Sequence, residues 1–152
     1  MSLIPAITSS NDQHRHWPWR CLQARLGDLQ GKTIAILGLV YTPNTDTLRR
    51  SAAVELCRKL LETGATVKAF DPAVKALPPA LAAVALTGSP SAALHGADAA
   101  VVCTEWPEFR QAAWSELLRT MRQPLVVDAN GFLEKELKDQ PRVEHLCVGR
   151  AP

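Results

Sequence analysis

The sequence lacks any run of 18 consecutive apolar residues, so it contains no candidate transmembrane helix. It also lacks an opening pattern of basic residues followed by an apolar stretch, and we therefore expect no secretory signal. An excess of one charge is missing too. The 17 basic and 15 acidic residues leave a net charge of +2, which is too small to indicate binding to nucleic acid or to a membrane surface.

Cysteine is scarce and scattered in the chain. The four cysteines form no CxxC pair and no Cys/His cluster at zinc-ligand spacing. Cys57, Cys103 and Cys147 stand among apolar neighbours, where a free thiol packs as a small hydrophobe. None of the four histidines belongs to a metal-ligand constellation, and we interpret them all as surface or incidental residues. We therefore expect no metal site, reduced thiols and a cytoplasmic location.

What the chain does have is a regular alternation of strand-like and helix-like segments. Apolar runs predict strands at residues 33–38, 66–70, 84–87, 99–104, 124–128 and 143–148. Helices are expected from about 18 to 27, from 45/46 to 64, and at 89–95, 107–121 and 132–138. Residues 1–10 are expected to form a disordered leader. This alternation predicts an α/β fold, a Rossmann-like three-layer α/β/α domain with a mainly parallel sheet.

Glycine is too sparse for an ordinary dinucleotide site. Ligands of parallel α/β sheets bind at the carboxyl ends of the strands, here the loops 38–49, 104–110 and 128–132. The first of these loops contains only Gly38 where the GxGxxG fingerprint needs three glycines. The sequence therefore does not indicate that this domain binds NAD in the usual way.

Three ordered motifs carry a more specific signal: GKTIAILGLVYTPNTDTLRRS from Gly31, VVCTEWPEFR from Val101 and VVDANG from Val126. With their spacing, they resemble the C-terminal domain of the UDP-glucose/GDP-mannose dehydrogenase family. Asn11 matches an asparagine on the central helix of that family. The resemblance implies a division into the leader, a remnant of the central helix over 11–30 and a UDP-binding domain over 31–152.

Members of this family oxidise the 6-alcohol of a UDP-sugar to a carboxylate with NAD. The resemblance implies that NAD and the catalytic cysteine belong to an upstream domain, so we expect no catalytic residue here and no activity from this chain alone. Cys21 lacks the catalytic context of the family. A separate chain could supply the NAD-binding part. Family members pair through the central helix, so a homodimer is a further expectation, although Pro18 interrupts that region here.

The resemblance also assigns site residues. Tyr41, Thr42 and Asn130 fall at substrate-binding positions, and Arg49 falls at the arginine that reaches toward NAD on the other domain. The alternative for Arg49 is a solvated cation at a helix start. The family has lysine at position 42 and arginine at position 130. Loss of two charge-assisted hydrogen bonds would cost about 3–6 kcal/mol of binding free energy.

Three hypotheses for function follow from this pattern. The first is the nucleotide-sugar-binding domain of a UDP-sugar 6-dehydrogenase. The second, motivated by Thr42 and Asn130, is a degenerate, non-catalytic interaction or oligomerisation module. The third is a binder of another nucleotide or small anion.

Overall fold

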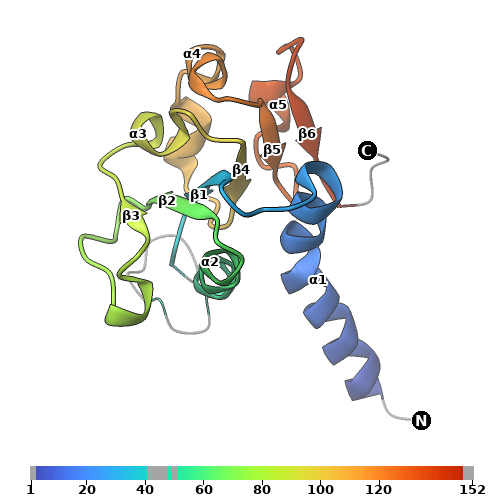
Figure 1. Ribbon diagram of the computed structural model, residues 1–152. Helices are drawn as coiled ribbons and strands as arrows, with labels where there is room; N and C mark the ends of the chain where they lie inside the picture. Colours follow the sequence, from blue (N-terminus) through green and yellow to red (C-terminus); the bar gives the residue numbers. More distant parts are fainter. Residues whose placement is uncertain (1–2, 41–47, 49–50, 149–152) are drawn as a thin grey trace.

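The computed structural model describes residues 3–40, 48 and 51–148, and these form helices on both faces of one sheet (Figure 1). The strands are β1 (Thr33–Leu37), β2 (Thr66–Phe70), β3 (Ala85–Leu86), β4 (Ala99–Val102), β5 (Leu125–Val127) and β6 (Glu144–Leu146). All neighbouring strands are parallel, and their order is β3-β2-β1-β4-β5-β6. The expected Rossmann-like α/β fold is confirmed.

Helices cover both faces of the sheet. They are α1 (Leu3–Leu26), α2 (Ala52–Glu62), α3 (Pro90–Leu94), α4 (Trp114–Thr120) and α5 (Glu134–Leu137), with 3-10 turns η1 (Pro79–Leu81) and η2 (Pro107–Gln111). Helix α1 packs on α2 and β5, whereas α3 packs on α4, β1 and β2. Thus α1 and α2 lie on one side of the sheet and α3 and α4 on the other (Figure 1). In the described part of the chain, no helix combines the length and apolar character needed to cross a membrane.

The core lies between these layers and is densest around the middle strands. All four residues of β4 are buried, and β4 pairs with β1 on one side and β5 on the other. Strands covered on both faces need apolar side chains at every position rather than at alternate ones. The prediction of a central strand at this point of the sequence is therefore confirmed.

The first helix, α1, starts earlier than the sequence predicted. It begins at Leu3 rather than near Pro18, so residues 3–10 are helical where a disordered leader was expected. Proline inside a helix costs about 3 kcal/mol because it removes one hydrogen bond and crowds the preceding turn. Tertiary packing offsets this cost: Leu22 is fully buried, and Trp17 and Trp19 pack against the core. The domain division at residues 10 and 30 stays a prediction.

Helix α2 begins later than its sequence pattern suggested. The expected caps, Thr45 and Asp46, lie outside the described residues, and the first turn is instead capped by Ser51. The Ser51 hydroxyl accepts from the amides of Ala53 and Val54 at 3.1 and 3.4 Å, the usual role of a serine N-cap. At the other end Gly64 has φ of 86°, which fits its predicted place just beyond the helix.

The predicted helix over 107–121 is two pieces. The 3-10 turn η2 ends at Gln111, Ala112 is extended, and α4 starts at Trp114. The indole of Trp114 donates to the carbonyl oxygen of Phe109 at 2.7 Å. That carbonyl is the one a continuous helix would offer to the amide four residues later, so the side chain competes with the helical bond.

Candidate functional site

The strand order reverses between β1 and β4. The chain leaves β1 toward β2 on one side and leaves β4 toward β5 on the other, so the two loops diverge at the carboxyl ends of these strands, where this topology is expected to form a crevice. This topological switch point is where open α/β sheets bind ligands. The described walls of the crevice are residues 38–40 after β1 and 103–106 after β4.

Gly38 makes the close approach of these walls possible. Its φ is 95°, a left-handed conformation that side chains disfavour. A Cβ at this position would lie 2.4 Å from Thr104 Cβ and 2.5 Å from the Thr104 amide nitrogen. The glycine is therefore needed for packing between the β1 and β4 loops.

A buried carboxylate fixes the backbone just beyond this glycine. Asp71, which follows β2, is 2% exposed, and its Oδ2 accepts from the amides of Leu39 at 2.7 Å and Val40 at 3.1 Å. The same oxygen accepts from the indole nitrogen of Trp106 at 3.1 Å, and Oδ1 accepts from the amide of Ala73 at 2.8 Å. One side chain thus joins the loops after β1, β2 and β4.

Two hydroxyl groups hold the carbonyl oxygens of the same loop. Ser51 donates to the Leu39 oxygen at 2.6 Å, and Thr104 donates to the Val40 oxygen at 2.7 Å. Both hydroxyls are buried. Leu39 and Val40 are therefore held through both their amide and carbonyl groups, which makes this wall of the crevice rigid.

The same contacts do not fit a dinucleotide. In the usual arrangement the pyrophosphate lies on the amides that open the helix after the first strand. Here the amides of Ala53 and Val54 are occupied by Ser51, and Thr104 fills the space that Gly38 leaves. Within the described residues 38–40 and 51–54, these amides are therefore not open to a pyrophosphate as they are in an ordinary Rossmann domain.

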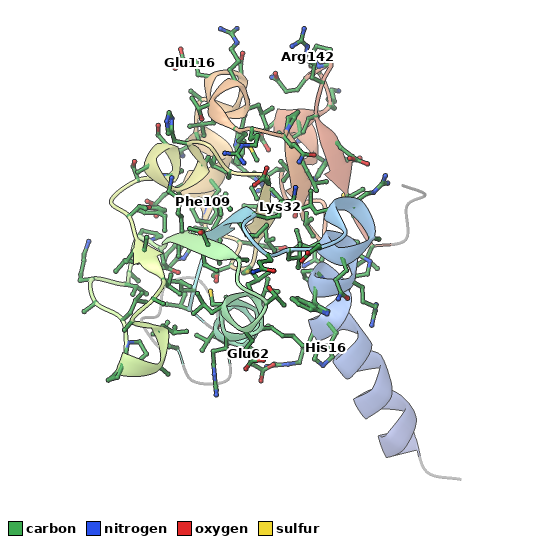
Figure 2. The ribbon with its side chains drawn as sticks, viewed as in Figure 1. His16, Lys32, Glu62, Phe109, Glu116 and Arg142 are labelled. Carbon is green, nitrogen blue, oxygen red and sulfur yellow. The ribbon has the colours of Figure 1, made fainter. Side chains whose placement is uncertain are left out.

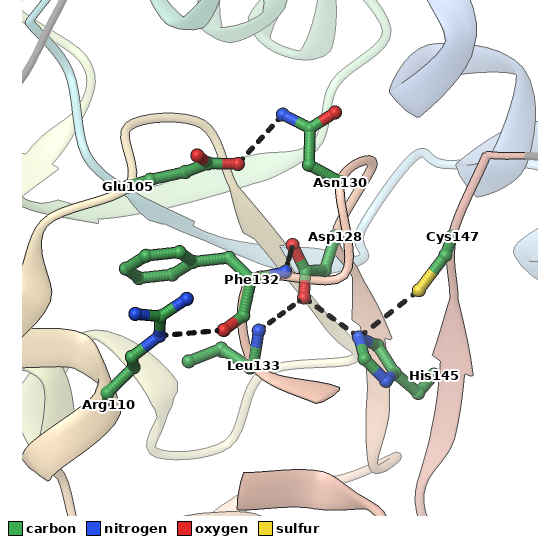
Figure 3. A network of polar contacts seen from close by, with 8 residues as sticks. All are labelled: Glu105, Arg110, Asp128, Asn130, Phe132, Leu133, His145 and Cys147. Atoms are coloured by element: carbon green, nitrogen blue, oxygen red, sulfur yellow. Dashed lines mark hydrogen bonds and ion pairs between the residues drawn. The ribbon is translucent and has the colours of Figure 1, made fainter. Parts of the chain in front are cut away.

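The loop after β5 is organised by a second buried carboxylate, Asp128 (Figure 3). Its oxygens accept from the amides of Phe132 at 3.0 Å and Leu133 at 2.9 Å, and Oδ2 lies 2.9 Å from His145 Nε2. The His145 side chain is only 9% exposed. The interpretation of all four histidines as surface or incidental residues was therefore wrong for His145, which joins β6 to the β5 loop.

Cys147 completes this cluster without forming a catalytic relay. Its Sγ lies 3.5 Å from the same Nε2 of His145 that faces Asp128. A carboxylate accepts, so Nε2 carries the proton and has no lone pair to take one from a thiol. A nucleophile–base–acid relay needs the thiol and the carboxylate on different ring nitrogens. The arrangement supports packing and excludes an activated cysteine here.

Asn130 stands at the tip of the β5 loop and meets the β4 loop. Its Nδ2 donates to Glu105 Oε2 at 2.8 Å (Figure 3), and Asn130 is exposed. This contact brings together two residues that the sequence motifs place 25 positions apart. Nearby, Arg110 donates to the carbonyl oxygen of Phe132 at 3.0 Å and stacks over its ring at 3.9 Å.

The other predicted site residues fall outside this description. Tyr41, Thr42 and Arg49 lie outside the described residues, so their substrate-binding and cofactor-binding roles stay predictions.

Burial raises the pKa of three of the thiols, which makes them poor nucleophiles. Burial raises the pKa of Cys57 to about 12 and raises the pKa of Cys103 further, where neighbouring Cys57 adds to the effect. Burial also raises the pKa of Cys21, against the opposing charges of Arg20 and Arg25. Among the described residues, no three His, Cys, Asp or Glu side chains gather as a metal site would require.

Comparison with known proteins decides the family. Residues 35–135 match the model of the "UDP-glucose/GDP-mannose dehydrogenase family, UDP binding domain". The chain belongs to the UDP-glucose/GDP-mannose dehydrogenase family. The match covers the strands from β1 to β5, and thus both walls of the crevice.

Named relatives of the family agree. A UDP-glucose 6-dehydrogenase of Pseudomonas aeruginosa is 43% identical over 113 residues, which cover 70% of this chain and 25% of that protein. One of Rhizobium meliloti is 32% identical over 150 residues, covering 97% of this chain and 34% of that protein. The chain thus spans a quarter to a third of the length of the curated relatives it matches.

Solved structures of the family share the fold. A UDP-glucose dehydrogenase of Pyrobaculum islandicum is 32% identical, with a TM-score of 0.67 over 82% of this chain and 28% of that one. An NDP-N-acetyl-D-galactosaminuronic acid dehydrogenase of Methanosarcina mazei reaches a TM-score of 0.74 over 90% of this chain and 29% of that one at 20% identity. The latter supports the fold alone.

Three residues that organise the loops after β2 and β5 were not singled out from the sequence. Asp71 and Asp128 were given no role, and His145 was interpreted as a surface or incidental residue. A usable signal did exist for the two carboxylates, because each directly follows an apolar strand. For His145 no local signal was present, since its partner lies 17 residues away.

Proposed function

We propose that this chain binds the UDP part of a UDP-sugar at the crevice between the β1 and β4 loops, as the UDP-binding domain of a UDP-sugar 6-dehydrogenase. The observation that carries the proposal is the coincidence of the topological switch point with a wall, residues 38–40, whose backbone is fixed by Asp71, Ser51 and Thr104. A wall that is already rigid loses little entropy when a ligand binds. The family match supports the assignment of the ligand class.

The chemistry of the described rim suggests how the ligand is oriented. Because Asn130 gives its amide N–H to Glu105, its Oδ1 remains to accept a hydrogen bond. Acceptors suit ribose hydroxyls or a base N–H and repel phosphate. Phosphate contacts then fall to the segment that carries Tyr41 and Thr42, whose role as substrate-binding residues is part of the proposal.

Oxidation of the sugar requires parts that this chain does not show. We assign NAD and the catalytic cysteine to a further domain or a separate chain in the cytoplasm, with Arg49 reaching toward that NAD. On this proposal the chain alone forms no NADH from UDP-glucose. NADH formation by the purified chain would contradict it. Gel filtration at several concentrations tests the accompanying expectation of a homodimer.

The direct test is a thermal-shift titration with UDP, UDP-glucose, UDP-glucuronate, GDP-mannose and NAD. A ligand at 100 times its dissociation constant adds about 2.7 kcal/mol to the free energy of unfolding, which raises the Tm of a domain of this size by roughly 5–10 °C. We expect shifts with the UDP compounds only. A shift with GDP-mannose or NAD alone would instead favour a binder of a different nucleotide.

A second candidate is an interaction module that no longer binds the nucleotide. The contact between Asn130 and Glu105 favours it, because a neutral amide stands where the family motif has arginine. On this account no UDP compound shifts the Tm at millimolar concentration, and the double variant Thr42→Lys/Asn130→Arg gains UDP binding. Absence of any gain in the double variant would count against this account.

A further inference from the structure

A second cleft lies at the amino ends of the strands, whereas the nucleotide crevice lies at their carboxyl ends. It is formed where β5 and β6 begin, between the last turn of α4 and the loop that leads into β6, and its volume is about 560 Å³. Volumes of this size are typical of small-molecule sites. Its lining consists of Ser115, Leu118, Arg119, Met121, Arg122, Pro124, Gln140, Pro141, Arg142 and Val143.

Positive charge is concentrated in this cleft. Three of the lining residues are arginines and none is acidic. Within the described residues, neither Arg119 nor Arg142 forms an ion pair, and both are exposed. In Figure 2, Arg142 is directed away from the body of the protein at the same end as Glu116, an α4 residue that does not line the cleft.

Two of the carboxylates near the cleft, Asp98 and Glu144, have other partners. Asp98 Oδ2 lies 3.9 Å from Arg122 Nη1, but that oxygen is buried and already accepts from the amide of Thr33 at 2.9 Å. The Arg122 side chain remains 66% exposed. Glu144, which follows the loop of Arg142, is paired with Arg25 at 2.6 Å. Exposed Glu116 and Asp139 are the other acidic groups near the cleft, and neither belongs to its lining.

The remaining wall of the cleft is apolar. Leu118 and Met121 are 9% and 7% exposed, and Pro124 and Val143 are half-buried beside them. Guanidinium groups bind carboxylate or phosphate oxygens in pairs, whereas this wall suits a carbon skeleton. The combination differs from a solvated charged face, in which the arginines would surround no cavity.

We propose that this cleft binds a small multivalent oxyanion, with two or more phosphate or carboxylate groups on a compact body. Arg119 and Arg142 hold the anionic groups from the two sides of the cleft, and Arg122 adds a third positive charge to its lining. This site is separate from the nucleotide crevice and does not depend on the function proposed for that crevice. Phosphate and carboxylate ligands share the chemistry that these groups recognise.

The test is a titration of the full chain, labelled with ¹⁵N, first with inorganic pyrophosphate and then with citrate. We expect amide shifts at residues 118–122 and 140–143 with at least one of the two anions. Each arginine replaced by glutamine should weaken binding about tenfold, so Arg119→Gln/Arg142→Gln should weaken it about 100-fold. Stronger binding of pyrophosphate would identify a phosphate ligand, and stronger binding of citrate a carboxylate.

The control is Arg58→Gln/Lys75→Gln, which removes two exposed positive charges outside the cleft. Its affinity for the anion should stay within about twofold of the parent chain. If both double variants bound the anion equally weakly, the overall charge of the protein would explain the effect, and the proposal would be overturned. Shifts confined to residues 38–40 and 104–106 would also overturn it, as would shifts that sodium chloride reproduces at equal ionic strength.

Discussion

Asp71 joins three loops of the crevice, and its charge state and shape are both needed for this. Its two oxygens accept four hydrogen bonds. In Asp71→Asn one oxygen becomes an NH₂ group that faces an N–H donor. We expect a loss of about 2–4 kcal/mol in the free energy of unfolding, measured by urea denaturation. The exposed change Asp139→Asn should cost less than about 0.5 kcal/mol, and equal losses in both would contradict this role.

Gly38 combines a left-handed backbone with a close contact, and a set of three variants separates the two effects. Gly88→Ala, at an open position without positive φ, should be neutral or slightly stabilising. Gly27→Ala has positive φ but no neighbour within 4 Å, and should cost about 1–2 kcal/mol. Gly38→Ala should cost more than Gly27→Ala, because Thr104 must also move. Thermal unfolding ranks the three, and a Gly38→Ala no worse than Gly27→Ala would disprove the clash.

Single residues also set the limit of what the sequence predicts about the site. Asn130 could be found because it stands in a motif, and the structure gives it a polar partner on the neighbouring loop. Asp71 could have been noticed because it directly follows a strand, but the roles of Asp71 and His145 could not be predicted, since they depend on contacts that the arrangement of strands sets. Asp71 meets Trp106 only because β1, which lies between β2 and β4, brings their loops together.

Helix α1 is anchored to the domain by a few contacts along one side. Arg15 pairs with Glu55 at 2.7 Å, Lys59 lies 5.2 Å from the centre of the Trp19 ring, and Leu22 is fully buried. Exposed ion pairs of this kind contribute less than about 1 kcal/mol each. The buried Leu22 and the two tryptophans therefore dominate the attachment of α1.

Replacing Pro18 should strengthen this helix. Pro18→Ala restores an amide that can donate to the carbonyl four residues earlier, and it removes the ring clash. We expect a gain of about 1–3 kcal/mol in helix stability, seen as higher helical content by circular dichroism and a higher Tm. Ala24→Pro, in the same helix, should have the opposite effect. No gain from Pro18→Ala would mean that the helix bends at this point and uses the missing bond.

At this level the sequence predicted the existence of elements better than their ends. Strand positions were correct within a few residues, because buried parallel strands need continuous apolar runs. The end of α1 was predicted within one residue, whereas its start and the break before α4 were missed. The break depends on a tryptophan contact rather than on local propensity. The Trp114 indole takes the Phe109 carbonyl oxygen from the backbone.

The protein as a whole should lose stability at alkaline pH through its buried thiols. The pKa of Cys57 rises from 9.0 to about 12 on burial, and a raised pKa means that the folded state holds its proton more tightly. Its contribution is complete below pH 9 and is lost as the pH rises toward 12, with a slope of about 1.4 kcal/mol per pH unit. Denaturation of Cys57→Ala across this range should show a shallower decline. An unchanged slope would contradict the burial effect.

The sequence predicted the fold class, an α/β domain with a parallel sheet, but it did not predict the order of the strands. Alternating strands and helices predict a parallel sheet covered on both sides, but several orders satisfy that pattern. The observed order places β1 in the middle, between β2 and β4. That position turns the β1 loop into one wall of the crevice.

A central first strand has a consequence for synthesis of the protein on the ribosome. Ile34 of β1 pairs with Ala99 of β4. The ribosome must therefore add 65 further residues before this edge of β1 can find its partner, which takes about 3–13 s at usual elongation rates. During that time the uncharged segment Thr33–Leu37 has strong strand propensity and an open edge, features that favour aggregation. Lys32 lies directly before this segment, at a position where a charge opposes aggregation, and we expect a nascent chain without this lysine to depend more heavily on chaperones.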